Sequence, residues 1–252
     1  MEAPGTQMAR YEQLDSVAHR NLRVATGFGA HFGDNVAMVP VFPGEYPDLQ
    51  REYPIFFRKD PAGGFQAVAL LGFDHHENLF LHHERWNAAC LPATVARGPF
   101  LIGFRDPPGD DGDGPRNQPV IHVDMAHPRV VAAGGEPVFL ADGGHSPYLD
   151  HIVGVLRGIH EGVEAGRVLY AALDEMELIQ PLTIDVRFDD GHGVNLAGLY
   201  GIDRERLAAL DAVSLSHLHR TGRLEAVHLL LASQRNLERL VGEKRRRLAA
   251  KS

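Results

Sequence analysis

The chain has 252 residues, with 25 lysines and arginines against 33 aspartates and glutamates, and a formal net charge of −8 when histidine is neutral. A chain of this length buries roughly 70–75% of the surface that its unfolded form exposes, so it needs neither a disulfide nor a structural metal to fold. The acidic balance argues against a nucleic-acid-binding protein, and the single cysteine, Cys90, excludes an intramolecular disulfide or a cysteine-rich metal site. The unusual count is that of histidine, with 15 residues, which is the one compositional hint of chemistry.

Neither an export signal nor a membrane span is predicted. Residues 1–14 carry polar and charged side chains where a secretory signal needs an apolar core. The best apolar run, residues 65–73, is strand-like and much shorter than the roughly 18 residues that indicate a membrane-spanning helix. We therefore expect a cytoplasmic protein.

The first half of the chain is predicted to be rich in β-structure. Six apolar runs with many β-branched and aromatic residues are candidate strands: 36–41, 55–57, 65–73, 78–81, 99–104 and 120–124. The turn-forming residues between them favour antiparallel neighbours joined by hairpins. A short helix is expected from Pro43 to Gln50, and residues 105–115, rich in aspartate, glycine and proline, are expected to form a loop.

A long helix is predicted to open the second half. Ser146 is a typical N-cap, and Pro147 suits the first helical position, where its missing N–H costs nothing. Apolar residues then recur at three- and four-residue spacing, which predicts one apolar helix face continuing to about Leu178.

The end of the chain is predicted to form a hairpin and two helices. Residues 182–188 and 194–202 indicate two strands joined across an acidic, glycine-containing turn. Helices are expected at 204–220 and 223–248, separated at Gly222. The predicted fold class is therefore α+β: a mostly antiparallel N-terminal sheet followed by a long helix, a β-hairpin and two C-terminal helices. Residues 1–252 are expected to form a single unit, with a possible division into a β-rich part, 11–140, and a helix-rich part, 146–250.

Short motifs follow one another along the chain in a characteristic order. They are Tyr53-Pro54-Ile55-Phe56-Phe57, Ala69-Leu70-Leu71-Gly72, Asn78-Leu79-Phe80, Trp86, Leu91-Pro92, Pro99-Phe100, Gly198-Leu199-Tyr200, residues 203–210, Leu218-His219-Arg220-Thr221-Gly222 and residues 231–237. Their order and spacing resemble the bacterial SapC-like family over residues 11–240. The resemblance implies a role near outer-membrane receptors and flavin-dependent halogenase-like proteins, in nutrient uptake or modification. It implies no catalytic residue.

Histidines are concentrated in residues 74–84, which hold four imidazoles and three carboxylates. These side chains are good ligands for zinc, copper, nickel or iron. On a strand, however, His76 and His82 would lie about 20 Å apart at roughly 3.3 Å per residue, and adjacent histidines would point to opposite faces. We interpret them as solvated hairpin ends, with a metal site as the alternative.

His122 and Asp124 form a better-shaped candidate metal site. An H-x-D pattern on a strand places the imidazole and the carboxylate on one face, about 6.6 Å apart. This pair is the local half of a 2-His-1-carboxylate triad, which leaves open positions on Fe(II) for an oxidant and a substrate. His192, later in the chain, is the candidate third ligand. We interpret the pair as part of an exposed strand face, with the metal site as the alternative.

Four glycines recur at four-residue spacing in the predicted long helix: Gly154, Gly158, Gly162 and Gly166. Each costs up to about 1 kcal/mol relative to alanine in a helix interior, so close packing must offset them. We expect another helix or strand of the same chain to approach this groove. A homodimer contact and a ligand groove are the alternatives.

The basic C-terminal segment, residues 243–251, is interpreted as a solvated helix end, with an acidic partner or nucleic acid as the alternative. Cys90 has apolar neighbours, which favours a packed thiol over a reactive one. The leading hypothesis is a non-catalytic SapC-like binding or accessory protein without a cofactor. Its partner would be a protein or a small-molecule ligand. The alternative is a metal-dependent enzyme, such as a mononuclear Fe(II) oxygenase, with Fe(II) or zinc bound.

Overall fold

The computed structural model describes residues 8–105, 118–188 and 193–250. Most of the loop expected at 105–115 and the turn expected at 189–193 lie outside these residues. The described part contains antiparallel strands, one long helix and further helices toward the C-terminus. This arrangement confirms the α+β prediction.

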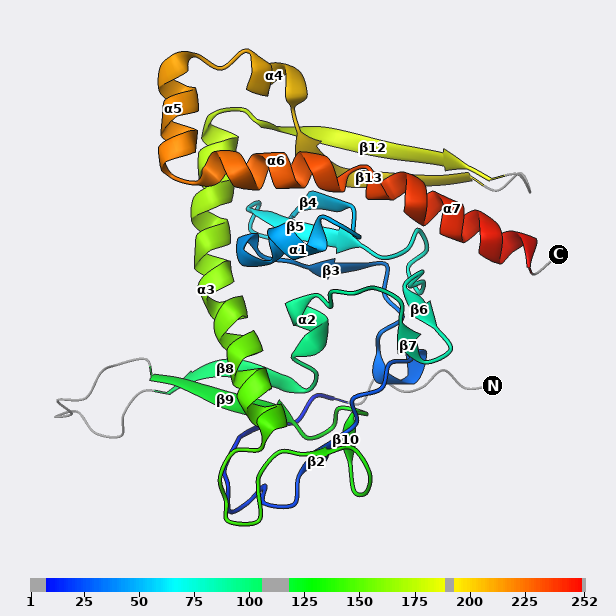
Figure 1. The fold of residues 1–252 in the computed structure, drawn as a ribbon, viewed down its shortest axis with the longest axis vertical. Coiled ribbons are helices and arrows are strands. Elements are labelled where there is room, and N and C mark those ends of the chain that lie inside the picture. The colour runs from blue at the N-terminus through cyan, green and yellow to red at the C-terminus, as the bar shows by residue number, and fades with distance from the viewer. Residues whose placement is uncertain (1–7, 106–117, 189–192, 251–252) are drawn as a thin grey trace, which may run out of the picture.

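The largest sheet has five antiparallel strands in the order β12-β13-β4-β5-β3 (Figure 1). Its strands are β3 (Met38–Pro40), β4 (Ile55–Lys59), β5 (Phe65–Leu70), β12 (Ile179–Arg187) and β13 (Gly193–Ile202). The two halves of the chain meet where Tyr200 of β13 pairs with Phe57 of β4. The predicted C-terminal hairpin therefore completes the N-terminal sheet.

Three smaller sheets lie apart from this one. Their strands are β1 (Tyr11–Gln13), β8 (Phe100–Arg105) and β9 (Gln118–Asp124); β2 (Arg23–Val24), β10 (Val130–Val131) and β11 (Glu136–Pro137); and β6 (Leu81–His82) with β7 (Arg85–Trp86). Short helical turns lie between strands in the first half of the chain: η1 (Ala30–Phe32), η2 (Pro43–Glu45), α1 (Tyr46–Leu49) and α2 (Ala93–Ala96). The short helix expected from Pro43 is thus confirmed, as η2 followed by α1.

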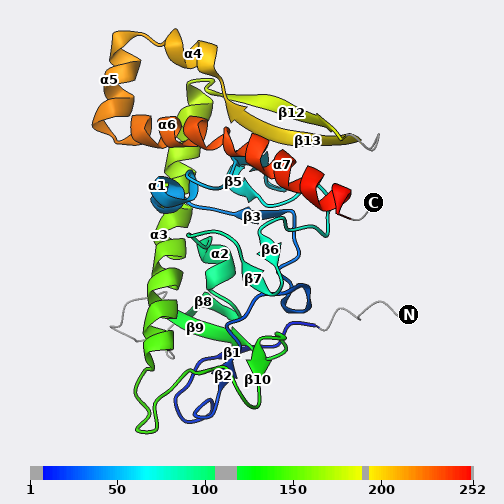
Figure 2. The same ribbon diagram turned by 45° about the vertical axis from the view of Figure 1, so that its right-hand side comes forward.

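The long helix α3 (Pro147–Glu175) connects two hydrophobic clusters. Its 29 residues span about 43 Å at about 1.5 Å per residue, and Figures 1 and 2 show it running along most of the molecule. The predicted cap is present, because the Ser146 hydroxyl accepts a hydrogen bond from the Leu149 N–H at 3.1 Å. Residues near its start, such as Ile152, pack with β8 and β9, whereas Leu173 near its end belongs to the core of the five-stranded sheet.

Within the described residues, the C-terminal part contains four helices, where the pattern predicts two. They are α4 (Arg204–Ala208), α5 (Ala212–Arg220), α6 (Arg223–Ser233) and α7 (Asn236–Ala249). Asp211 starts a new helix because its carboxylate accepts the Ser214 N–H at 2.7 Å. The break at Gly222 is confirmed, since this glycine has φ 71°, in the left-handed region. None of the helices within the described ranges combines the length and the apolar character needed to cross a membrane.

One predicted strand is wrong. Residues 78–80 form a turn, and β6 begins only at Leu81. The buried Asn78 side chain causes the difference: its Oδ1 accepts the Phe80 N–H at 2.9 Å, and its Nδ2 donates to the Asp34 carbonyl at 2.8 Å. Such local bonds from asparagine compete with strand pairing.

Candidate functional site

The predicted metal pair lies on one strand, β9, and its two members differ in their surroundings. Asp124 Oδ1 accepts the N–H groups of Arg10 and Ala126, at 2.8 and 3.0 Å, so this carboxylate caps backbone donors. The ring of His122 lies against the α-carbon of Gly103 on β8, and its Nδ1 is buried without a hydrogen-bond partner among the described residues. His192 lies outside the described residues. Within the described ranges, no three His, Cys, Asp or Glu side chains are grouped so that they could hold a metal ion.

The histidine-rich segment 74–84 is held by the last helix, α7. Lys244 Nζ donates to Asp74 Oδ2 at 2.6 Å and to Glu77 Oε1 at 2.7 Å, and His82 Nε2 lies 2.8 Å from Glu243 Oε1. The interpretation of residues 243–251 as a solvated helix end is therefore wrong for Lys244, which is buried in an ion-paired setting. Lys244 and Glu243 therefore bind α7 to this segment.

Glu243 is the electrostatic centre of this contact. Burial acts to raise its pKa, but hydrogen bonds from Arg246, His82 and Arg247 outweigh burial and lower the pKa to about 2. Arg247 also donates to the carbonyl of Leu79 at 2.7 Å. Glu243, Arg246 and Arg247 thus all have hydrogen-bond partners within the chain.

The four glycines of α3 fall into two pairs. Gly154 and Gly158 are exposed, and a Cβ at either would meet nothing within 4 Å. Gly162 is buried, and a Cβ there would lie 2.5 Å from Phe42 Cβ; at Gly166 it would lie 3.0 Å from the ring of Tyr170. Another segment therefore approaches this groove only at Gly162, through Phe42, because Tyr170, which lies against Gly166, belongs to α3 itself.

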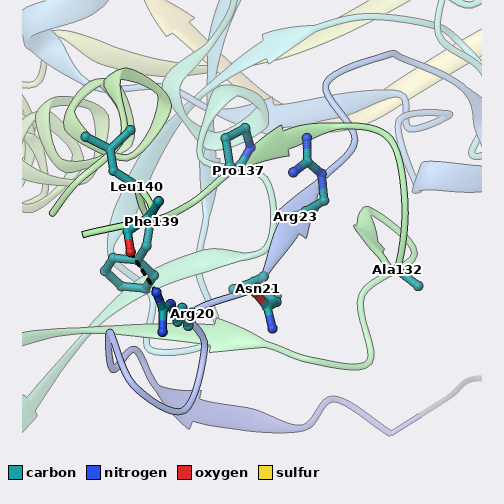
Figure 3. Close-up of a pocket in the computed structure, with 9 residues that line it drawn as sticks. Arg20, Asn21, Arg23, Ala132, Pro137, Phe139 and Leu140 are labelled. Carbon is teal, nitrogen blue, oxygen red and sulfur yellow. Dashed lines mark hydrogen bonds between the residues drawn. The ribbon is translucent and has the colours of Figure 1, made fainter. Parts of the chain in front are cut away.

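A pocket with a volume of about 650 Å³ lies beside β2 (Figure 3). We call it the Arg20–Arg23 pocket. Its walls come from residues 20–23 and, across the sheet, from Ala132, Pro137 and residues 139–141. Phe139 and Leu140 supply an apolar wall, and the volume is typical of small-molecule sites.

The two arginines of this pocket are fixed by backbone carbonyls. Arg20 Nη2 donates to the Ala141 carbonyl at 2.8 Å, and Arg23 donates from Nε and Nη2 to the carbonyls of Gly134 and Gly135, at 2.7 and 3.0 Å. Within the part of the chain that the structure describes, neither guanidinium has a carboxylate within salt-bridge distance. Since a guanidinium has five N–H donors, both keep donors for a ligand.

The turn before β2 sets the position of Arg20. The Asp15 carboxylate accepts the N–H groups of Val17 and Ala18, at 2.9 and 2.8 Å, and these bonds lower the pKa of Asp15. His19, at the end of the turn, is buried, and its Nδ1 accepts the Asp15 N–H at 3.2 Å. These hydrogen bonds fix the conformation of residues 15–19, which directly precede Arg20.

No local pattern identifies this site in the sequence. The contact of Arg20 with Ala141 joins residues 121 positions apart, and that of Arg23 with Gly134 joins residues 111 apart. Two arginines three residues apart in an ordinary surface segment carry no signal of a pocket. Only the fold brings Pro137 and residues 139–141, the opposite wall of the pocket, next to these arginines.

Comparisons with known proteins point to one family. The family model described as SapC matches residues 14–240. A search of curated proteins finds no match, and a search of solved structures finds none either.

Proposed function

Because the chain belongs to the SapC family, we propose that it acts as a non-catalytic binding protein that holds an anionic ligand in the Arg20–Arg23 pocket. The observation that carries the proposal is the pair of guanidinium groups without a carboxylate partner among the described residues, beside a cavity of about 650 Å³. In a chain of formal net charge −8, two such cations at one cavity provide a local attraction for a negative group.

The lining indicates a ligand with two parts. Guanidinium groups recognise carboxylate and phosphate oxygens through paired N–H donors. Phe139, Leu140 and Pro137 present apolar surface to the same cavity, and Leu140 is 43% exposed. A carboxylate or phosphate attached to an apolar chain satisfies both parts.

Such binding agrees with an accessory role in uptake or modification, which the family resemblance implies. A carrier or adaptor needs a preformed site with donors held in place. Arg20 and Arg23 meet this requirement because backbone carbonyls fix both guanidinium groups. The described residues that line the pocket include no nucleophile paired with a base, which is the reason for proposing binding without chemistry.

Calorimetric titration with three probes of equal chain length tests the proposal. Octanoate and octyl phosphate share the anionic chemistry, whereas octylamine has the opposite charge. We expect both anions to bind, octylamine not to bind, and added salt to weaken binding because exposed charges are screened. Comparing the two anions separates a carboxylate ligand from a phosphate ligand.

Arg20→Gln is the informative variant, because Arg20 makes a single described hydrogen bond to the backbone. Loss of a charged hydrogen bond lowers affinity roughly tenfold or more. Arg58→Gln is the matched control, since Arg58 is an exposed arginine on β4 away from the pocket. Equal binding of octylamine, or unchanged affinity in Arg20→Gln, would contradict the proposal.

A metal-dependent function remains the second candidate, with one observation in its favour. His122 Nδ1 is a buried nitrogen without a described partner, as a metal ligand would be in a protein without its ion. Asp124 and the distal His192 would complete the set for Fe(II) or zinc.

A further inference from the structure

A second cavity of about 210 Å³ lies where α2 and the start of α3 meet the segment that follows β2. We call it the junction cavity. Phe28, Leu91 and Val95 supply apolar walls, and Arg129, Tyr148 and His151 supply polar groups. Apolar walls with a few convergent polar groups are typical of small-molecule sites.

Arg129 is a charged side chain that is 5% exposed and almost fully engaged by the protein. Its Nη2 donates to both oxygens of Asp34 at 2.8 Å, and its Nη1 donates to the carbonyls of Ala25, at 3.2 Å, and Gly27. The remaining donor, Nε–H, has no partner among the described residues. Nε is also not fully buried, so a molecule in the cavity can reach it. Nε–H is therefore the guanidinium donor left for a molecule in the cavity.

Two aromatic rings fix this guanidinium further. Its carbon lies 4.6 Å from the centre of the Phe32 ring and 5.6 Å from that of Phe28, within the range of cation–π contacts. Phe28 is also a wall of the cavity. The donor is thus held in place before a ligand arrives, which reduces the entropy cost of binding.

Tyr148 provides a second donor close to the first. Its hydroxyl has no hydrogen-bond partner in the described part of the chain, and burial raises its pKa to about 12, so it keeps its proton at neutral pH. Gly98 leaves the space between the two groups open, because a Cβ there would lie 3.7 Å from Arg129 Cδ and 3.8 Å from Tyr148 Oη. A side chain at position 98 would occupy this space.

Size and charge select the ligand. An apolar cavity of about 150 Å³ holds a benzene molecule, so a cavity of about 210 Å³ accepts one ring with a small substituent. Asp34 neutralises the charge of Arg129, so the cavity offers hydrogen-bond donors without a large net charge. We infer that the junction cavity binds a single-ring molecule through a carbonyl or carboxyl oxygen, which accepts from Arg129 Nε and the Tyr148 hydroxyl.

Benzamide, benzoate and toluene test this inference. They share one ring, and the first two carry the oxygen acceptor in neutral and anionic form. Binding is measured by calorimetry and by the fluorescence of Trp86, the sole tryptophan, whose ring centre lies 5.6 Å from that of Phe28. We expect benzamide or benzoate to bind at least several-fold more tightly than toluene, and the preferred one identifies the charge of the natural group.

Two variants assign the binding to this cavity. Tyr148→Phe removes one hydrogen bond, so we expect the affinity for the preferred probe to fall roughly two- to tenfold. Ala96→Leu fills the cavity from α2 and should abolish binding. Tyr11→Phe, at an exposed tyrosine on β1, is the matched control, and Arg20→Gln should leave this binding unchanged because it affects the other pocket.

Three results would each overturn the inference: no binding of any probe to the folded protein, toluene binding as tightly as benzamide and benzoate, or full affinity in both Tyr148→Phe and Ala96→Leu. Thermal melting shows that each variant is folded. If Tyr148→Phe does not fold, Ala96→Leu carries the decision.

Discussion

Alanine substitutions at two glycines one helical turn apart should have opposite effects on stability. Gly158 is exposed, and a Cβ there meets nothing within 4 Å. Gly158→Ala should therefore stabilise the protein by up to about 1 kcal/mol, the difference in helix propensity between glycine and alanine. Gly162→Ala makes the same gain but places its Cβ 2.5 Å from Phe42 Cβ and 2.8 Å from Phe42 Cγ.

The contact at Gly162 decides the sign of its effect. A separation of 2.5 Å between carbon atoms is far below the ordinary 3.5–4.0 Å of favourable contacts. Overpacking of a core costs about 1–3 kcal/mol, so Gly162→Ala should be neutral or destabilising by up to about 2 kcal/mol after the helix gain. The two variants should differ by about 1–3 kcal/mol.

Urea unfolding followed by circular dichroism measures this difference as a shift of the transition midpoint at constant slope. Phe42→Ala provides the second half of a double-mutant cycle, because it removes Phe42 Cγ and the ring, which also crowd the new methyl group, and leaves only the contact with Phe42 Cβ. Gly162→Ala should then be less harmful in the Phe42→Ala background. If Gly162→Ala stabilises the wild type as much as Gly158→Ala does, the packing of α3 against Phe42 is refuted.

Three further measurements follow from the structure. Arg129→Met should destabilise the protein by about 3–5 kcal/mol in urea unfolding, because it leaves a buried carboxylate without its partner; an effect below about 1 kcal/mol would contradict this role. The pKa of Glu243 is lowered from 4.5 to about 2, so its stabilising contribution is complete above about pH 4.5 and is lost as the pH falls toward 2. Glu243→Gln should flatten the pH dependence of stability in this window, whereas the exposed Glu238→Gln should not. Metal analysis of protein purified without a histidine tag decides the metal alternative: stoichiometric iron or zinc that is lost on replacing His122 and Asp124 supports it, and a stable, metal-free protein refutes it.

Local signals predicted much of the fold. Ser146 caps α3, and Gly222 has the left-handed φ that ends one helix and begins the next. Both features depend on a few neighbouring residues, so a sequence pattern contains all the information they require. The strand at 78–80 failed because Asn78 bonds to its own turn and to Asp34, a residue 44 positions away.

The candidate sites depend on contacts that no local pattern contains. Arg129 and Asp34 are 95 residues apart, and Lys244 and Asp74 are 170 apart. The histidine-rich composition suggests metal ligands, yet the donors on which the two proposed sites depend belong to arginine and tyrosine. A charged residue in the sequence looks the same whether its partner is water, a carboxylate or a ligand, and only the fold distinguishes these cases.

The joining of β13 to β4 has a consequence for how the protein reaches its fold. Strand β4 pairs early with its chain neighbour β5, but its other edge is covered only when β13 arrives, and the nearby bond between Ile55 and Ser233 spans 178 residues. During synthesis, an apolar strand edge rich in phenylalanine therefore stays open while more than a hundred further residues are added. Closing such long-range pairs is slow, and open edges promote association between chains. Refolding yield should therefore fall steeply as protein concentration rises. The β12–β13 hairpin protects the chain from association, because its pairing with β4 closes the aggregation-prone edge.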